Sequence, residues 1–242
     1  MISNKSVLMF DLLGTLLPIS REDFKDEYFS LIRKDFDEYK GMGFTKSLKK
    51  AVVAIENNDG TINNRELFWD VFDALLGAKV SEKSDKFKEF FKNDFNKLKD
   101  KVGIKAKRRG FVDKCHDRDY ELVLAADPTF PIEAIETMLS WVGLVKEDFI
   151  YISTFDNSSY GKGNKLYFNE LLYAIGKTPD ECLMIGNNAE KDSLAREAGI
   201  DVYIVTDYLE GELINKNSGI MSGCFEDLKK FLKKMSKKKK KD

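Results

Sequence analysis

The sequence contains little of the chemistry that zinc sites and disulfide scaffolds require. There is a single histidine, His116, and it stands among charged residues, where a surface side chain is expected. The three cysteines, Cys115, Cys182 and Cys224, are widely spaced and form no CxxC pair. This spacing argues against a cluster of soft metal ligands and against a disulfide framework. Reduced thiols are typical of the cytoplasm, so the sequence predicts a cytoplasmic protein.

Long hydrophobic runs and a charge imbalance are also missing. No segment approaches the ~18 consecutive apolar residues of a membrane helix, and the first residues do not resemble a signal peptide. The formal net charge is only −1, because 40 basic residues nearly cancel 41 acidic ones. A chain with this balance does not favour nucleic acid or another polyanion as a partner. We expect a frayed, disordered basic tail over 236–242, and no feature of the sequence specifies an oligomeric state.

Five short apolar runs, rich in branched side chains and bounded by turn formers, indicate strands. Their apolarity is continuous rather than alternating, which is typical of strands buried on both faces of a parallel sheet. The runs are 7–10, 122–125, 150–152, 182–185 and 202–205. Helical patterns separate the later runs: one is capped by Asn164 and stops at Gly176, and another extends from about Asp192 to Gly199. This alternation predicts an α/β, doubly wound, Rossmann-like sheet.

The segment between the first two runs has helical periodicity and almost no strand signal. The hydrophobic spacing predicts helices over 20–41, 46–55, 64–76 and 85–98. A helical block inserted after the first strand, before the sheet resumes, is best explained as a cap domain. We therefore expect a core domain formed by 1–17 and 103–235, a helical cap over 18–102 and the basic tail over 236–242.

Polar residues follow the predicted strands at the point where each strand ends. Asp11 follows the first strand, Asp127 the second, Lys162 lies beyond the third, and Asp192 follows the fourth. Ligands of open α/β sheets bind at the carboxyl ends of the strands. Asp11, Lys162 and Asp192 are therefore expected to converge on one edge of the sheet.

This order of motifs resembles the haloacid dehalogenase (HAD) superfamily, which is dominated by magnesium-dependent phosphatases. The resemblance covers nearly the whole chain and includes a helical cap in the first insertion position. It implies a hydrolase of a small phosphorylated molecule, in which Asp11 attacks phosphorus and forms an aspartyl-phosphate intermediate. Lys162 would neutralise the nucleophile and the phosphate. The resemblance places the phosphate near Gly14, Thr15, Ala126, Asp127 and Lys162.

Three positions depart from the family pattern. Leu13 replaces the Asp that protonates the leaving group, and such help is typically worth about 10²–10⁴-fold. Ala126 replaces a Ser or Thr that donates a hydrogen bond to the phosphoryl oxygen, and Asn188 replaces an acidic magnesium ligand. Asp11, the Leu13 carbonyl, the Asn188 amide oxygen and Asp192 through water could still hold Mg²⁺. This set carries less negative charge than the family norm, so the sequence predicts weak or absent magnesium binding.

The sequence leaves three functions open. The first is a phosphatase-like hydrolase of reduced or altered activity, acting on a phosphate whose leaving group needs no protonation. The second is a non-catalytic descendant that binds a phosphorylated ligand or a protein partner, which the three losses together favour. The third, carbon–halogen cleavage, requires neither the second Asp nor magnesium, but it does not explain Ala126. It would also need a cap arginine near the halide, such as Arg21, Arg33 or Arg65, and we rank it last.

Overall fold

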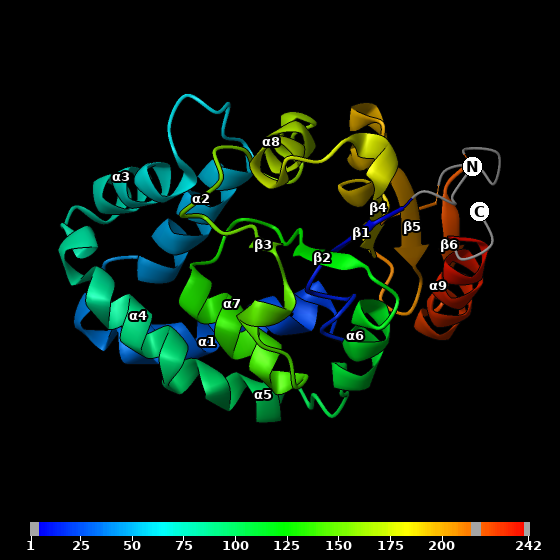
Figure 1. The fold of residues 1–242 in the computed structure, drawn as a ribbon. Helices are drawn as coiled ribbons and strands as arrows, with labels where there is room; N and C mark the ends of the chain where they lie inside the picture. Colours follow the sequence, from blue (N-terminus) through cyan, green and yellow to red (C-terminus); the bar gives the residue numbers. More distant parts are fainter. Residues whose placement is uncertain (1–4, 214–218, 240–242) are drawn as a thin grey trace.

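The structure of the protein, a computed structural model, describes residues 5–213 and 219–239. Its centre is a parallel sheet of six strands in the order β3-β2-β1-β4-β5-β6 (Figure 1). The strands are β1 (Val7–Phe10), β2 (Glu121–Leu124), β3 (Tyr151–Ile152), β4 (Cys182–Gly186), β5 (Asp201–Val205) and β6 (Met221–Gly223). In β1, Met9 lies opposite Val123 of β2 on one side and Met184 of β4 on the other. The strand order therefore reverses between β1 and β4, the place where open α/β sheets form ligand sites.

The five apolar runs of the sequence correspond to β1–β5, and the predicted doubly wound α/β sheet is confirmed. Strand ends differ from the predicted ones by one residue at most. β6 has no signal in the sequence, because Met-Ser-Gly is short, lies at the sheet edge and forms no apolar run. Among the described residues, no helix combines the length and the apolarity that a membrane span needs.

Helices cover both faces of the sheet. One face packs against α6 (Arg109–His116), α7 (Ile132–Trp141) and α9 (Phe225–Lys239), and Leu8 and Phe10 belong to this side. The other face packs against α8 (Leu166–Ile175) and the 3₁₀ helix η7 (Asp192–Ala198), with Val7 and Met9 in the same cluster. Successive residues of β1 thus enter different clusters, as the pleat of a strand requires.

Capping residues set the ends of the elements that lead to the site. Asn164 Oδ1 accepts a hydrogen bond from the Leu166 N–H (3.0 Å), and α8 ends where Gly176 adopts a left-handed φ of 63°. The second expected helix is η7, a 3₁₀ helix that ends before Gly199 (φ 84°). α9 continues to Lys239 and so enters the segment predicted to be a disordered tail. The rest of that tail, 240–242, lies outside the described residues.

Five α-helices lie between β1 and α6: α1 (Arg21–Asp35), α2 (Phe44–Glu56), α3 (Asn64–Leu76), α4 (Ser84–Lys92) and α5 (Lys97–Lys101). Ser20 caps α1, since its Oγ accepts a hydrogen bond from the Asp23 N–H (3.1 Å). The helix predicted over 20–41 ends at Asp35 and is followed by a 3₁₀ turn. The helix predicted over 85–98 is divided into α4 and α5, because Asn93 (φ −111°, ψ −78°) departs from helical dihedrals.

The inserted helices pack directly onto the sheet layer. Thr137 of α7 donates a hydrogen bond to the Phe91 carbonyl of α4 (2.9 Å), and Trp141 Nε1 donates to Asn96 Oδ1 (3.0 Å). The ring centroids of Phe95 and Trp141 are 5.3 Å apart. One hydrophobic cluster therefore runs from the inserted helices to the sheet, and Figure 1 shows α4 and α5 close to α7. The boundaries of a separate cap remain a prediction.

We expect the inserted helices and the sheet to unfold in one cooperative transition, because they share this core. The chain contains two tryptophans, Trp69 in α3 and Trp141 in α7, so each part carries its own fluorescent reporter. Urea unfolding of Trp69→Phe and of Trp141→Phe should give, within each variant, coincident fluorescence and circular-dichroism transitions. A Trp69 signal that changes before the sheet is lost would instead show a cap that unfolds on its own.

Candidate active site

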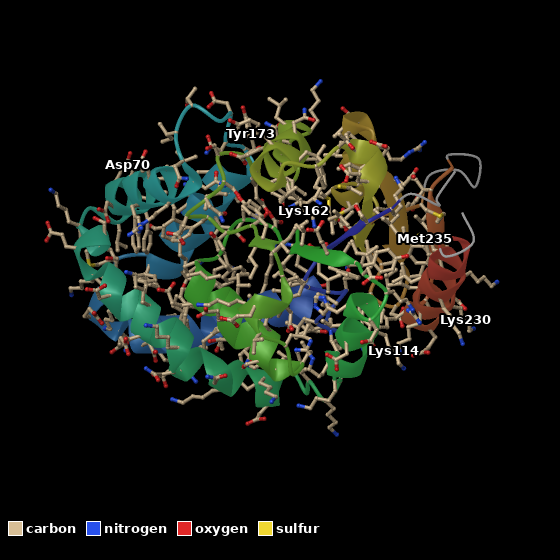
Figure 2. The ribbon with its side chains drawn as sticks, viewed as in Figure 1. Asp70, Lys114, Lys162, Tyr173, Lys230 and Met235 are labelled. Atoms are coloured by element: carbon tan, nitrogen blue, oxygen red, sulfur yellow. The ribbon has the colours of Figure 1, made fainter. Side chains whose placement is uncertain are left out.

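A buried lysine lies between two carboxylates at the carboxyl edge of the sheet. Lys162 Nζ is 2.5 Å from Asp11 Oδ1 and 2.7 Å from Asp192 Oδ1, and the three residues are at most 2% exposed. Asp11 follows β1 directly, Asp192 begins η7 after β4, and Lys162 comes from the loop before α8. Figure 2 shows Lys162 inside the molecule, unlike Lys114 and Lys230. The structure thus brings together the three side chains that the sequence predicts to converge.

The charges of this triad determine its protonation. Burial raises the pKa of Asp11, Lys162 lowers it and Asp192 raises it again, so that the pKa stands at about 6. Burial alone would lower the pKa of Lys162, but the two carboxylates outweigh burial and raise it above its ordinary value. At pH 7, Lys162 is therefore a cation and Asp11 is mostly ionised. Asp11 Oδ2 is buried and has no hydrogen-bond partner among the described residues, which leaves this oxygen free to contact a ligand.

Two glycines make room for the polar groups around the triad. At Gly186 a Cβ atom would lie 1.9 Å from Asp192 Oδ2, so a larger residue would displace the carboxylate. Gly14 has a φ of 84°, and a Cβ atom there would lie 2.1 Å from Asn187 Nδ2. The Thr15 hydroxyl donates a hydrogen bond to Asn187 Oδ1 (3.2 Å). These close contacts join the loop after β1 to the loop after β4.

The side-chain oxygens that the sequence assigns to magnesium are mostly engaged. Asn188 Oδ1 accepts hydrogen bonds from the backbone N–H groups of Glu190 (3.0 Å) and Lys191 (2.8 Å). Asp192 Oδ2 accepts one from the Asn188 N–H (2.9 Å), and its Oδ1 faces the buried lysine. Within residues 5–213 and 219–239, no three His, Cys, Asp or Glu side chains gather as a metal site would require. Of the assigned side-chain oxygens, Asp11 Oδ2 has no hydrogen bond among the described residues and Asp192 Oδ1 is held only by the ion pair with Lys162, so these residues as arranged do not fit a resident Mg²⁺.

A second ion-pair network joins the inserted helices to the sheet beside the triad. Asp127 Oδ2 lies 3.2 Å from Arg21 Nη1 and 2.8 Å from Lys191 Nζ. Arg21 also pairs with Glu210 (3.1 Å), and Lys191 with Glu56 (3.1 Å). Arg21, from α1, is one of the cap arginines considered above for a halide site. Asp127 is one of the residues that the sequence places near the phosphate, whereas Glu56, Lys191 and Glu210 carry no signal in the sequence, because they meet only when distant segments fold together.

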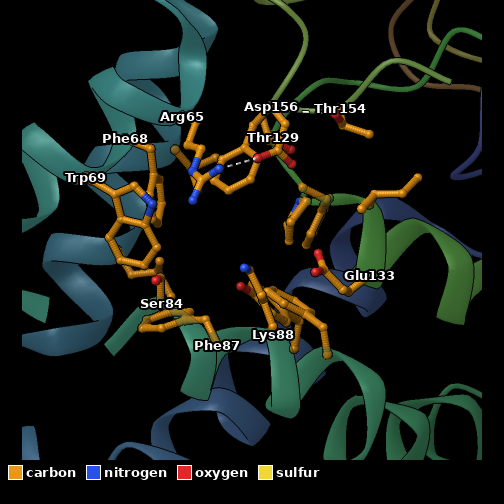
Figure 3. A pocket seen from close by; sticks show the side chains of 18 of the residues that line it. Arg65, Phe68, Trp69, Ser84, Phe87, Lys88, Thr129, Glu133, Thr154 and Asp156 are labelled. Carbon is orange, nitrogen blue, oxygen red and sulfur yellow. Dashed lines mark hydrogen bonds and ion pairs between the residues drawn. The ribbon is translucent and has the colours of Figure 1, made fainter. Parts of the chain in front are cut away.

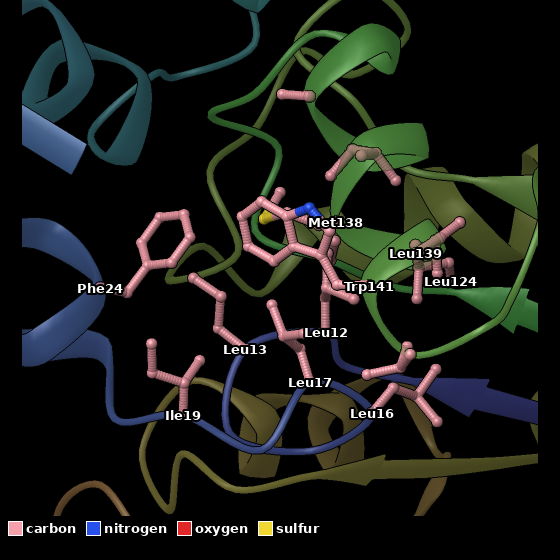
Figure 4. Packing of buried hydrophobic residues seen from close by; sticks show 14 of the residues in the cluster. Leu12, Leu13, Leu16, Leu17, Ile19, Phe24, Leu124, Met138, Leu139 and Trp141 are labelled. Atoms are coloured by element: carbon pink, nitrogen blue, oxygen red, sulfur yellow. The ribbon is translucent and has the colours of Figure 1, made fainter. Parts of the chain in front are cut away.

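The two positions that lack the family's polar side chain are buried. Leu13 is 7% exposed and belongs to the hydrophobic cluster that also contains Phe24 and Trp141 (Figure 4). Ala126 is 2% exposed, and its carbonyl oxygen lies 2.9 Å from Tyr167 Oη. Neither side chain can donate a proton or a hydrogen bond to a ligand at Asp11.

Two cavities contact Leu13. The smaller, about 20 Å³, also contacts Asp11, Ala126 and Asp127 and has room for about one water molecule. The larger, about 440 Å³, lies between α1–α4 and the segments that follow β2 and β3 (Figure 3). Both cavities are lined by Leu13, Arg21, Thr129 and Phe130. A molecule in the larger cavity therefore lies next to the space in front of the Asp11 carboxylate.

Comparison with known proteins bears on the fold. No family model matches the sequence, and no curated protein matches it. Among solved structures, the HAD hydrolase YfnB from Bacillus subtilis, bound to magnesium, is similar with a TM-score of 0.59 at 18% identity, over 95% of this chain and 99% of that one. A predicted phosphatase from Clostridium acetobutylicum has a TM-score of 0.57 at 15% identity, over 96% and 100% of the two chains. A dehalogenase with an intermediate complex has a TM-score of 0.54 at 14% identity, over 96% and 98%.

These similarities cover the inserted helices as well as the sheet, because they extend over almost the whole chain. The chain therefore has the α/β fold of the haloacid dehalogenase superfamily, as the motifs in the sequence predict. Solved structures with this fold include a predicted phosphatase and a dehalogenase. The chemistry has to be argued from the site, since fold alone does not define it.

Asp127 is expected to stabilise the fold in a pH-dependent way. Burial raises the pKa of its carboxyl, but Arg21 and Lys191 outweigh burial and lower it to about 2, against an ordinary value of 3.8. The ionised form therefore contributes about 2 kcal/mol above roughly pH 4, and this contribution is lost as the pH falls toward 2. Asp127→Asn should lower the free energy of unfolding by about that amount at pH 7, and by about half as much at pH 3, in urea titrations. Asp100→Asn, on the surface of α5, controls for the loss of one charge; an equal deficit at both pH values would contradict the ion pairs.

Magnesium is expected to bind weakly, because cations of the protein already neutralise the two carboxylates, Asp11 and Asp127, that have an unpaired oxygen beside the small cavity. Calorimetric titration with MgCl₂ should give a dissociation constant in roughly the millimolar range or weaker. Asp11→Asn should remove the residual binding, while Asp100→Asn should leave it unchanged. A micromolar affinity for the unaltered protein would show that the oxygens around the triad rearrange to coordinate the ion.

Proposed function

We propose that this chain is a phosphatase-like hydrolase of altered activity, in which Asp11 Oδ2 attacks the phosphorus of a small phosphorylated molecule. The observation that carries the proposal is the asymmetry of the Asp11 carboxylate. Lys162 holds Oδ1 at 2.5 Å, while Oδ2 is buried without a hydrogen-bond partner among the described residues. A nucleophile needs an oriented oxygen that no protein donor occupies, and Asp11 Oδ2 meets this condition. The HAD-like hydrolase fold supports the same assignment.

The surroundings of Asp11 suit attack on phosphorus and do not suit protonation of a leaving group. With a pKa of about 6, the carboxyl is predominantly ionised at pH 7. Lys162 would offset the negative charge that the carboxylate and the phosphoryl group bring together. Leu13 has no proton to give to the departing oxygen. The substrate must therefore carry a leaving group that departs as a stable anion, as an acyl or aryl oxide does.

A non-catalytic protein that binds a phosphorylated ligand or a protein partner is the second candidate. The cavity in front of Asp11, about 20 Å³, has room for about one water molecule and is lined by Arg21 and Asp127, which pair with each other. A phosphoryl group enters only if this ion pair or the neighbouring Phe130 side chain moves. The loss of the family's acid, hydroxyl and metal-ligand side chains favours the same interpretation.

Carbon–halogen cleavage is the third candidate. Arg21 reaches the site from α1, as a halide-binding arginine would. Its guanidinium is already paired with Asp127 and Glu210, however, and the site has no hydroxyl at Ala126. We therefore rank carbon–halogen cleavage behind the other two functions, as the sequence does.

Turnover assays separate these functions. We expect hydrolysis of acetyl phosphate and of 4-nitrophenyl phosphate, with a rate that falls below about pH 6 as the Asp11 carboxylate takes up a proton. Asp11→Asn should lower the rate by about 10³-fold or more, because it removes the nucleophile. Leu13→Asp should confer hydrolysis of an alkyl phosphate such as propyl phosphate, since it supplies a general acid. Leu13→Asn is the matched control, because asparagine has the size of aspartate but cannot donate an acidic proton.

Each candidate function predicts a different result in these assays. A folded protein that turns over neither phosphate would leave the binding function. Chloride release from 2-chloropropionate would establish the dehalogenase reaction in place of phosphate hydrolysis. Phosphate hydrolysis that survives Asp11→Asn would exclude Asp11 as the nucleophile.

A further inference from the structure

Nine aromatic side chains line the larger cavity, together with other apolar residues and a comparable number of polar and charged ones. Its volume of about 440 Å³ is typical of small-molecule sites. The aromatic residues come from α1, α3, α4 and the segment after β2, and include Phe24, Phe68, Trp69, Phe87, Phe91 and Phe130. Several of these rings meet edge to face; the centroids of Trp69 and Phe87, for example, are 5.2 Å apart with an interplanar angle of 88°. Walls of this kind present both ring faces and ring edges to a flat guest.

Two charged residues of the larger cavity lie at its mouth, whereas Arg21, whose side chain is 17% exposed, lines the end next to the nucleophile. The side chains of Arg65 and Lys88 are 47% and 41% exposed, whereas Leu13 and Phe24 are 7% and 1% exposed. Leu13 and Phe130 supply apolar surface to the wall shared with the smaller cavity, and the Arg21 guanidinium in that wall is already paired with Asp127 and Glu210. In Figure 3, Arg65 and Lys88 point toward the open centre of the cavity. An apolar guest would lie against Leu13, and its polar substituents would face the mouth.

We propose that this cavity holds the leaving group of the substrate and that the leaving group is aromatic, so that the substrate class is the aryl phosphates. The inference rests on the proposed function of Asp11. Two separate features point to it: the aromatic lining beside the nucleophile, and the missing proton donor at position 13. Sugar phosphates suit these features less well, because the phenylalanine and leucine side chains offer their hydroxyls no hydrogen-bond partner, and their alkoxide leaving group needs a proton.

The reaction balances without a general acid. Asp11 Oδ2 forms a bond to phosphorus as the bond from phosphorus to the aryl oxygen breaks, and the bonding pair leaves with the aryl oxide, which takes a proton from solvent. Water then attacks the phosphorus of the aspartyl phosphate, the bond to Asp11 breaks, and inorganic phosphate and the free carboxylate result. A phenol such as that of tyrosine has a pKa near 10, whereas water, which resembles an alkyl alcohol, has a far higher pKa. An aryl oxide therefore departs without the proton that an alkoxide requires.

The test compares aryl phosphates with acetyl phosphate, which has no ring. We expect kcat/KM to increase from phenyl phosphate to 4-nitrophenyl and 2-naphthyl phosphate, and propyl phosphate not to react. Trp69→Ala should lower kcat/KM for the aryl phosphates relative to that for acetyl phosphate by about tenfold, mostly through KM, and Trp69→Phe should restore most of the difference. Tyr173→Ala, at a residue of α8 that is 90% exposed, is the matched control and should leave the ratio unchanged.

A binding measurement tests the aromatic cavity independently of phosphate hydrolysis. Calorimetry with 4-methylphenol should show binding to the unaltered protein and to Asp11→Asn, and weaker binding to Trp69→Ala. Equal kcat/KM for aryl and acetyl phosphates, with no effect of Trp69→Ala on their ratio, would overturn the aryl assignment while the role of Asp11 stands. Phenol binding that depends on Trp69, without turnover of any phosphate, would overturn the proposed hydrolase and support an aromatic-binding pocket.

Discussion

The ammonium group of Lys162, buried between Asp11 and Asp192, is the interaction on which the site depends. Two carboxylates this close would repel each other without a cation, and burial would protonate one of them. Desolvation offsets most of the energy that a buried ion pair contributes, so the value of this triad lies in position more than in stability. It holds the loops after β1, β3 and β4 at one point. The triad also requires a glycine at position 186, because the Asp192 carboxylate occupies the space that a side chain there would need.

A second ion-pair network, centred on Asp127, lies beside the Lys162 triad and restricts access to Asp11. Asp127, between Arg21 and Lys191, ties α1 to the edge of the sheet, and the space left in front of Asp11 is about 20 Å³. A ligand that reaches the nucleophile must displace one of these partners. A phosphoryl group suits such an exchange, because it offers the two cations the negative charge that Asp127 otherwise supplies. The same network that closes the site could therefore receive an anionic substrate.

The strands and the meeting of Asp11, Lys162 and Asp192 could be predicted from the sequence. Continuous apolar runs mark strands buried on both faces, and in a parallel sheet the carboxyl ends of such strands share one edge. The ion pairs of Arg21 and Lys191 could not be predicted, since they join segments far apart in the sequence whose side chains have no periodic pattern. The same holds for the packing of α4 and α5 on α7. Periodicity shows that a helix has an apolar face, but it does not show which surface covers that face.

Leu13 and the aromatic side chains of the larger cavity belong to one hydrophobic cluster. A carboxylate in place of Leu13 would stand in a hydrophobic cluster with a residue exposure of 7%, and desolvation would raise its pKa or weaken the packing around Phe24. Leucine instead continues the apolar wall that separates the two cavities. An apolar wall here excludes a general acid, and the absence of a general acid restricts the chemistry to leaving groups that are already stable as anions. On the proposed function, both restrictions select the same molecule, because an aryl oxide fills an aromatic cavity and departs without a proton.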